Sequence, residues 1–221
     1  MPADFEKQSY WRSRFASETS FEWLTSSATF MSILEPYLSS SPRPARILQL
    51  GSGTSDLHTR FRARGYLDVT NVDYEPLALE RGRALEARVF GDVRLEYAVA
   101  DATRLDRDLL PKSQPQSQSR HGFDVVVDKS TADAVSCGGA EAVLRMAEGV
   151  RRCLADGGVW ISLSYSGERY EVDGLPFDVE IVAKIPTPKV KAGNPEVWHW
   201  CYVLRPLEDE MCRRDSDDRS D

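Results

Sequence analysis

A glycine-rich turn is the first segment of the chain whose residues could hold a ligand. It reads Leu50-Gly51-Ser52-Gly53-Thr54-Ser55 and follows a short apolar segment. When such a turn joins a first strand to a helix, backbone N–H groups and the helix N-terminus come close to a bound ligand. The third glycine of a dinucleotide-binding GxGxxG would fall at Asp56, which argues against a nicotinamide dehydrogenase.

Three aspartates follow successive apolar segments. Asp73 ends the second segment, 22 residues after Gly51, where a carboxylate can accept hydrogen bonds from both ribose hydroxyls of a nucleoside. Asp101, followed by Ala102, comes after the third segment, where a carboxylate beside an adenine can accept from the exocyclic amine. Asp128 closes the fourth segment. Each aspartate alone is compatible with a strand-end cap, but the carboxyl ends of parallel strands share one edge, so together they predict a nucleoside site.

Alternating helix and strand patterns supply the elements that must position these residues. Strands are predicted over 46–50, 69–73, 94–99, 123–127, 159–163, 179–185 and 197–204, and helices over 30–38, 55–64, 76–90 and 140–154. Gly157 and Gly158 are predicted to stop the last helix. The two final strands have no helix pattern between them and predict an antiparallel hairpin. The fold class is therefore α/β: a three-layer Rossmann-like sandwich on a mostly parallel seven-stranded sheet.

Composition narrows the function classes. The 221 residues include 28 basic and 35 acidic side chains, a net charge of −7, which argues against a protein held on nucleic acid by its overall charge. No apolar stretch approaches a membrane span, and residues 1–7 lack the apolar core of a secretory signal. The three histidines show no metal-binding spacing, so we expect no metal. The four cysteines form no CxxC pair and indicate reduced thiols in a cytoplasmic protein: Cys137, Cys153, Cys201 and Cys212.

We expect one domain over residues 1–207. Its first part, 1–45, precedes the first strand and forms an N-terminal cap segment. Residues 111–121 are rich in Gln, Ser and Pro and predict a flexible insertion. Residues 208–221 carry seven acidic and three basic side chains, a local charge of −4, and predict a disordered acidic tail.

Four segments resemble a known family. In chain order they are 10–15 (YWRSRF) with 21–23 (FEW), then 47–55, 71–74 and 124–134. With the terminal hairpin, they resemble the class I, seven-stranded S-adenosylmethionine-dependent methyltransferases. More narrowly, they resemble the elongation factor 1-alpha lysine methyltransferases and their methyltransferase-like relatives, whose motifs read YWxxRY, LGCGNS, VDYS and EKGTLDA. The resemblance covers the chain from residue 9 to about residue 165.

The resemblance implies S-adenosyl-L-methionine as cofactor and an aromatic lid over it. Together with Ser52 and Gly53 of the turn, the residues expected to bind the cofactor are Trp11, Phe15, Trp23, Gly51, Asp73, Tyr74, Asp101, Ala102 and Lys129. It also implies a protein substrate that resembles an elongation factor. The chain departs from the family at several positions, and those near the acceptor side are Asp128 for glutamate, Ser130 for glycine and Ala132 for leucine.

Methyl transfer from a sulfonium needs little from the protein beyond a nucleophile held in line at about 3–3.5 Å. No catalytic residue is assigned. Asp128 is the candidate for orienting an acceptor amine, although it could instead hold the methionyl ammonium or cap its strand. We favour a protein lysine as acceptor and expect a monomer. A small-molecule acceptor and a non-catalytic, methyltransferase-like binding protein remain alternatives. A nucleic-acid amino-methyltransferase would carry an Asn/Asp-Pro-Pro-aromatic motif where residues 128–131 stand.

Overall fold

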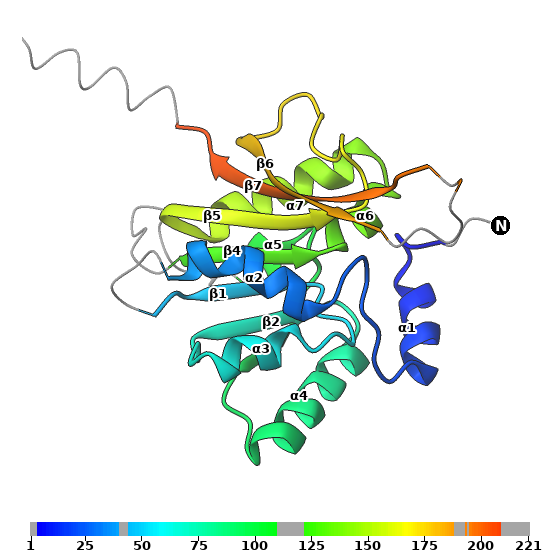
Figure 1. Cartoon of the computed structure of the whole chain (residues 1–221), viewed down its shortest axis with the longest axis vertical. Helices are drawn as coiled ribbons and strands as arrows, with labels where there is room; N and C mark the ends of the chain where they lie inside the picture. Colours follow the sequence, from blue (N-terminus) through cyan, green and yellow to red (C-terminus); the bar gives the residue numbers. More distant parts are fainter. Residues whose placement is uncertain (1–3, 40–43, 110–121, 188–192, 194, 209–221) are drawn as a thin grey trace, which may run out of the picture.

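The computed structural model describes residues 4–39, 44–109, 122–187, 193 and 195–208. Its strands form one seven-stranded sheet in the order β3-β2-β1-β4-β5-β7-β6 (Figure 1). The strands are β1 (Ile47–Leu50), β2 (Val69–Asp73), β3 (Glu96–Val99), β4 (Phe123–Lys129), β5 (Leu154–Ser164), β6 (Phe177–Pro186) and β7 (Trp198–Pro206). The helices are α1 (Gln8–Ser17), α2 (Ser27–Leu38), α3 (Leu57–Ala63), α4 (Pro76–Phe90), α5 (Leu105–Asp108), α6 (Thr131–Ser136) and α7 (Ala140–Cys153).

The first five strands are parallel, and β7 is antiparallel to both β5 and β6. Consequently the carboxyl ends of β1, β2 and β4 lie at one edge of the sheet, as the sequence predicts. The register pairs Leu50 of β1 with Val72 of β2 and with Asp128 of β4. This pairing brings the glycine-rich turn, Asp73 and the segment after β4 to the same end of the molecule.

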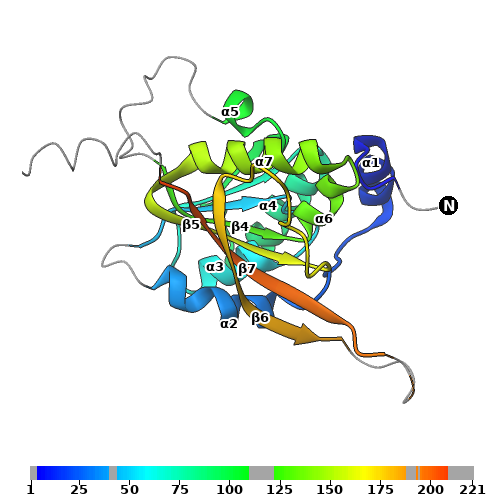
Figure 2. The same cartoon turned by 90° about the horizontal axis from the view of Figure 1, so that it is seen from above.

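Helices cover both faces of the sheet. Figure 2 shows α2 and α3 on one side of the strands and α7 on the other. Alternation along β1 explains the two layers: Ile47 packs in the core cluster that contains Phe30 of α2, whereas Leu48 packs in the cluster that contains Met146 of α7. Both clusters consist of buried apolar side chains, and burial of such side chains supplies most of the driving force for folding.

The predicted fold class is confirmed, and one detail of the sequence interpretation is wrong. Helix α7 ends at Cys153, before the glycine pair, and β5 begins at Leu154. Gly157, with φ of +74°, and Gly158 lie inside β5, where the chain bulges. Phe123 pairs with Leu154 and Val125 pairs with Val159, so β5 carries three residues more than β4 between these pairs. Residues 111–121 and 209–221, predicted as an insertion and as most of the tail, lie outside the described residues.

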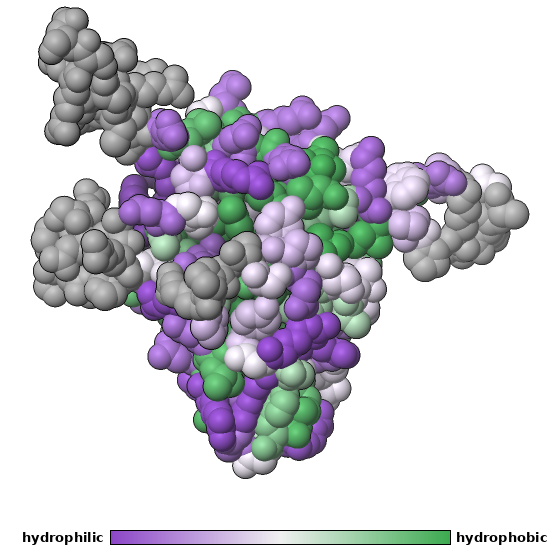
Figure 3. All heavy atoms as spheres, turned by 60° about the vertical axis from the view of Figure 1, so that its left-hand side comes forward, coloured by the Kyte–Doolittle hydropathy of each residue, from purple (hydrophilic) through white to green (hydrophobic). Residues whose placement is uncertain are grey.

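The end of the molecule opposite the carboxyl ends of the parallel strands has a mixed surface. Figure 3 shows hydrophobic patches on this side separated by hydrophilic side chains. Within the described part of the chain, none of the helices has both the length and the apolar character needed to cross a bilayer.

Candidate functional site

A cavity of about 630 Å³ lies at the carboxyl ends of β1, β2 and β4. Residues 4–25, which we call the lid, contribute several of its walls, and Figure 1 shows α1 and the chain after it beyond this edge of the sheet. The volume is within the usual range for small-molecule and cofactor sites. All eleven residues predicted to bind the cofactor line this one cavity: Trp11, Phe15, Trp23, Gly51, Ser52, Gly53, Asp73, Tyr74, Asp101, Ala102 and Lys129.

The glycine-rich turn has a conformation that requires its glycines. Gly51 and Gly53 have φ values of +57° and +52°, which residues with a side chain rarely adopt. A Cβ at Gly51 would also overlap the hydroxyl of Thr131. That hydroxyl donates to the carbonyl oxygen of Leu50 at 2.9 Å and so fixes the turn against the start of α6. The turn residues from Gly51 to Ser55 line the cavity.

Asp73 is held rigidly at the end of β2. Its carboxylate accepts hydrogen bonds from the backbone N–H groups of Gly53, at 2.9 Å, and Glu75, at 3.0 Å. The side chain is almost completely buried, and burial raises the pKa of Asp73 to about 6. Each carboxylate oxygen has further acceptor capacity. Asp73 can therefore accept hydrogen bonds from ribose hydroxyls without losing its backbone partners.

Asp101 forms a local turn at the cavity wall. Its carboxylate accepts from the backbone N–H of Thr103 at 2.9 Å and pairs with the guanidinium of Arg104 at 3.0 Å. Val72, Ala100 and Ala102 provide apolar surface beside it. A flat purine could lie against these small side chains.

The lid is rich in aromatic side chains that face the cavity. The expected rings Trp11, Phe15 and Trp23 line it, and so do Phe5 and Phe21, which sequence reasoning did not single out. The ring centroids of Phe5 and Trp23 lie 5.8 Å apart, and those of Phe21 and Trp23 lie 5.1 Å apart. The FEW segment carries Phe21 and was a signal available in the sequence. Both pairs are arranged edge to face. The face of an aromatic ring attracts a desolvated cation.

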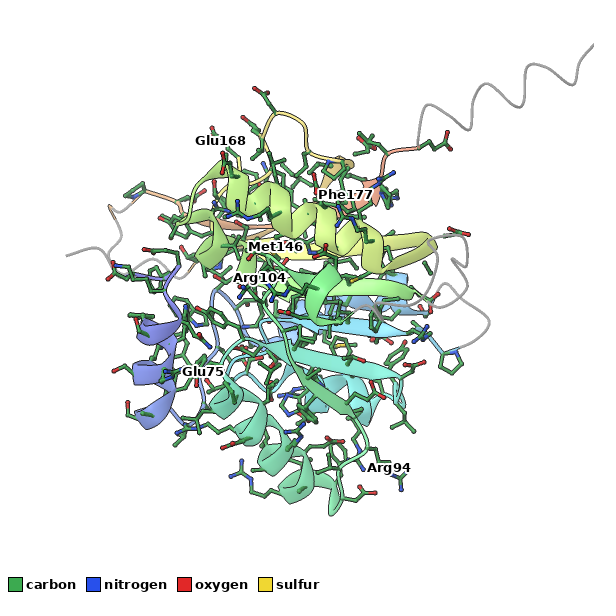
Figure 4. The ribbon with its side chains drawn as sticks, turned by 180° about the vertical axis from the view of Figure 1, so that it is seen from behind. Glu75, Arg94, Arg104, Met146, Glu168 and Phe177 are labelled. Atoms are coloured by element: carbon green, nitrogen blue, oxygen red, sulfur yellow. The ribbon has the colours of Figure 1, made fainter. Side chains whose placement is uncertain are left out.

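Polar contacts fix the lid to the rest of the protein. Arg12 of α1 pairs with Glu75 at 3.3 Å, and Figure 4 shows Glu75 between α1 and α4. The carboxylate of Glu18 accepts from the Thr54 hydroxyl at 2.6 Å, which ties the lid to the glycine-rich turn. The lid is therefore held by side chains on both sides of the cavity.

Asp128 is not among the described residues that line the cavity. Because side chains alternate along β4, Asp128 points into the core toward α7, where it accepts from the backbone N–H of Ala132 at 3.1 Å and from the indole N–H of Trp160 at 2.9 Å. Burial raises the pKa of Asp128 to about 6. The acid that does reach the cavity from this segment is Asp133 of α6, which the sequence interpretation did not select.

Asp133 is saturated by its neighbours. Its carboxylate pairs with the guanidinium of Arg169 at 2.7 Å. It also accepts from the hydroxyls of Ser130, at 3.0 Å, and Ser164, at 2.5 Å, and from the backbone N–H of Tyr165 at 2.9 Å. These bonds join the segment after β4 to the segment after β5 and fix the wall on that side.

Gln49 is a further lining residue whose role could not be read from the sequence. It lies on β1 below the turn and is 3% exposed. Its Oε1 atom has no hydrogen-bond partner within the described residues. Buried polar atoms are normally satisfied, so this oxygen is a free acceptor at the cavity.

The donor and acceptor groups of the cavity fit S-adenosylmethionine. Asp73 can accept from the ribose, the small apolar residues beside Asp101 can contact the adenine, and the glycine-rich turn leaves room for the methionyl group. The aromatic lid suits a sulfonium, and Gln49 offers a free oxygen. Within the described residues, no group of three His, Cys, Asp or Glu side chains could hold a metal ion.

Comparison with known proteins also indicates a methyltransferase. No protein-family model matches the chain. The chain is 57% identical over 204 residues to methyltransferase srdJ of Neurospora crassa. The alignment covers 92% of this chain and 84% of that protein. It is 29% identical over 181 residues to EEF1A lysine methyltransferase 4 of Mus musculus. That alignment covers 76% of this chain and 64% of the mouse protein.

A solved structure shows the same fold. The N-methyltransferase NodS from Bradyrhizobium japonicum, in complex with S-adenosyl-L-homocysteine, superposes with a TM-score of 0.62 at 13% identity, over 90% of this chain and 99% of NodS. The seven-stranded sheet, the cavity at its carboxyl edge and the high identity to a methyltransferase agree with one another. The chain belongs to the class I, S-adenosylmethionine-dependent methyltransferases.

Proposed function

We propose that the enzyme N-methylates a lysine side chain of a protein substrate. The lysine methyltransferase of Mus musculus named above supports this acceptor, and an elongation factor 1-alpha-like protein is the partner that such relatives suggest. Because this chain spans less than two thirds of that relative's length, the partner is part of the proposal. Ten of the eleven residues predicted to bind the cofactor are proposed in that role, and the eleventh, Lys129, is assigned a different role below.

The observation that carries the proposal is the pairing of Asp133 with Arg169 in an aromatic-lined cavity. A lysine amine must be neutral to attack, although its ordinary pKa is about 10.4. A free carboxylate beside the amine would keep it protonated, whereas a carboxylate already paired with a guanidinium does so much less. Aromatic walls exclude water and lower the pKa of the amine further.

The opening of the cavity can accommodate an extended alkyl chain. Phe21 and Tyr165 both line the cavity and are 42% and 60% exposed, so they lie where it meets solvent. Phe21 belongs to the lid and Tyr165 follows β5. A lysine side chain that passed between these rings would keep its methylenes in contact with apolar surface while its amine reached the interior.

The reaction itself needs little chemistry from the protein. The cofactor supplies a methyl group on a positively charged sulfur, which is displaced as the amine nitrogen forms its new bond to carbon. The turn and Asp73 would orient the donor, and the lid rings would exclude water from the reacting atoms. Asp133, held by Arg169, would position the acceptor-side wall.

A small-molecule acceptor is the second candidate. The cavity lining continues along α6 to Cys137 and reaches Arg145 of α7, which provides more surface than a single alkyl chain needs. In addition, the acceptor-side positions Ser130 and Ala132 differ from the lysine methyltransferase motif.

The experiment is transfer of labelled methyl groups. The purified enzyme is incubated with methyl-labelled S-adenosylmethionine and cell extract, and the protein and low-mass fractions are separated. Label on lysine residues of a protein band supports the proposal, whereas label confined to the low-mass fraction overturns it in favour of a small-molecule acceptor. The Asp73→Ala variant, weakened in cofactor binding, is the matched control and should label neither fraction.

A further inference from the structure

Lys129 at the end of β4 has an unusual environment for a residue expected to contact the cofactor. Its side chain is only 5% exposed, and its ammonium lies 2.7 Å from the Glu22 carboxylate of the lid. The same ammonium donates to the backbone carbonyl of Trp23 at 2.8 Å and to that of Thr25 at 3.1 Å. An ammonium has three N–H donors and no acceptor, so these three partners use its whole capacity.

The three partners belong to one short stretch of the lid. Between the two accepting carbonyls lies Leu24, which has φ of +63° and also lines the cavity. Bulky side chains rarely adopt this left-handed conformation, so the surrounding contacts must hold it. Lys129 holds the residues on both sides of Leu24 and thereby fixes the direction in which Trp23 points.

Glu22 links the same ammonium to the cofactor side of the cavity. Its carboxylate accepts from the backbone N–H of Asp56 at 3.0 Å and from the hydroxyl of Ser27 at 2.9 Å. Asp56 directly follows the glycine-rich turn, and Ser27 begins α2. Glu22 therefore connects the lid, the turn and the end of β4 through one carboxylate.

We propose that Lys129 is a positioning residue that latches the lid over the bound cofactor through Glu22, and that it is not itself a cofactor ligand. The latch joins the segment that carries the acceptor-side residues, 128–134, to the aromatic lid. Closure of the lid is thereby coupled to the position of residues 128–134 on the acceptor side of the cavity.

A double-mutant cycle tests the latch without any methyl acceptor. The variants are Lys129→Met, Glu22→Gln and the double variant. Met fills the space of the lysine stem, and Gln keeps the shape of Glu22 and its capacity to accept from Asp56. The readouts are hydrogen exchange of residues 18–25 in the free protein and the dissociation rate of S-adenosyl-L-homocysteine, followed by tryptophan fluorescence.

We expect Lys129→Met to speed dissociation by about tenfold and Glu22→Gln by about threefold or more, with the double variant no faster than Lys129→Met. Both single variants should raise exchange in residues 18–25. Lys129→Arg should restore slow dissociation in part, because a guanidinium can reach the same acceptors. Lys184→Met, which removes a lysine above the Trp200 ring on the terminal hairpin, is the control and should change neither readout.

Two results would overturn the proposal. If Lys129→Met weakens cofactor binding while Glu22→Gln has no effect and exchange in the lid stays unchanged, Lys129 contacts the cofactor directly. If lid exchange rises but dissociation does not change, the lid does not control the cofactor. Neither result bears on the proposed lysine acceptor, because both readouts use the product cofactor alone.

Discussion

The indole N–H of Trp160 donates to the Asp128 carboxylate at 2.9 Å in the interior of the protein. Trp160 lies on β5, and its ring contacts Tyr170 and Phe177 edge to face, with centroids 5.2 and 5.7 Å away. Two neighbouring strands are therefore joined by a polar bond within an aromatic cluster. Asp128 is therefore a buried residue of the core beneath the cavity.

The first prediction concerns the stability contributed by this bond. Trp160→Phe removes the donor and should lower the free energy of unfolding by about 1–3 kcal/mol at pH 7.5. The pKa of Asp128 is about 6 in the folded protein, so the carboxylate is ionised at pH 7.5 and mostly protonated at pH 5. Losing a donor penalises the ionised form more, so the destabilisation should be larger at pH 7.5 than at pH 5.

Urea unfolding of both proteins at the two pH values measures this difference. Trp200→Phe, at a half-buried tryptophan of β7, is the control and should give the same loss at both pH values. A Trp160→Phe effect that is independent of pH would mean that the indole stabilises the core by packing alone.

Asp128 also shows where sequence reasoning reached its limit. The sequence predicts correctly that Asp73, Asp101 and the segment after β4 meet at one edge, because that follows from the order of parallel strands. It does not predict which acid of the 128–134 segment faces the cavity. That choice depends on the face of β4 that each side chain takes and on the short helix α6, whose six residues are too few for a visible period.

The bulge in β5 could not be predicted for a different reason. Gly157 and Gly158 follow a helical pattern, so a helix stop was the local interpretation. Whether a glycine pair ends a helix or forms a bulge depends on pairing with β4, and the paired residues Phe123 and Leu154 are 31 residues apart in the chain. Long-range pairing of this kind leaves no local sequence signal.

The second prediction is a pH dependence of cofactor affinity. Ribose hydroxyls donate to the ionised form of Asp73, whose pKa is about 6 in the free protein. Binding should therefore be strongest above pH 7 and should weaken below pH 6, by up to about tenfold per pH unit. Titration calorimetry with S-adenosyl-L-homocysteine between pH 5 and pH 8 measures this. Asp73→Asn should bind more weakly and lose the dependence, whereas a flat profile for the parent protein would remove Asp73 from the ribose site.

The third prediction concerns Ser130, which has φ of +70° at the start of α6. A left-handed conformation costs a residue with a side chain about 1 kcal/mol, which glycine avoids. The Ser130 hydroxyl also donates to Asp133 at 3.0 Å. Ser130→Ala loses this bond and keeps the strain, whereas Ser130→Gly loses the bond and relieves the strain.

Ser130→Gly should therefore be more stable than Ser130→Ala by about 1 kcal/mol in urea unfolding. The comparison of the two variants removes the hydroxyl from consideration, since both lack it. Equal stabilities would show that the backbone at this position carries no strain.

The last prediction concerns the aromatic lid. Deleting residues 1–25 should leave a folded domain, because α2 begins at Ser27 with Ser26 as its N-cap and the sheet begins at Ile47. Phe15 is 3% exposed and lies against Gly53 of the turn, so its loss opens the cavity to water. Affinity for S-adenosylmethionine should fall markedly. Far-ultraviolet circular dichroism and a cooperative urea transition check that the shortened protein folds.

The charge of the cofactor distinguishes a lid that recognises the sulfonium from one that only excludes water. Cation–π contacts contribute about 2 kcal/mol when desolvated, and S-adenosyl-L-homocysteine lacks the positive charge. The deletion should therefore weaken S-adenosylmethionine binding more than S-adenosyl-L-homocysteine binding, by about tenfold or more. Trp23→Leu, which keeps an apolar side chain but removes the ring, should reproduce part of that difference. Equal losses for the two ligands would mean that the rings act only as a hydrophobic cover, since a thioether and a sulfonium differ chiefly in charge.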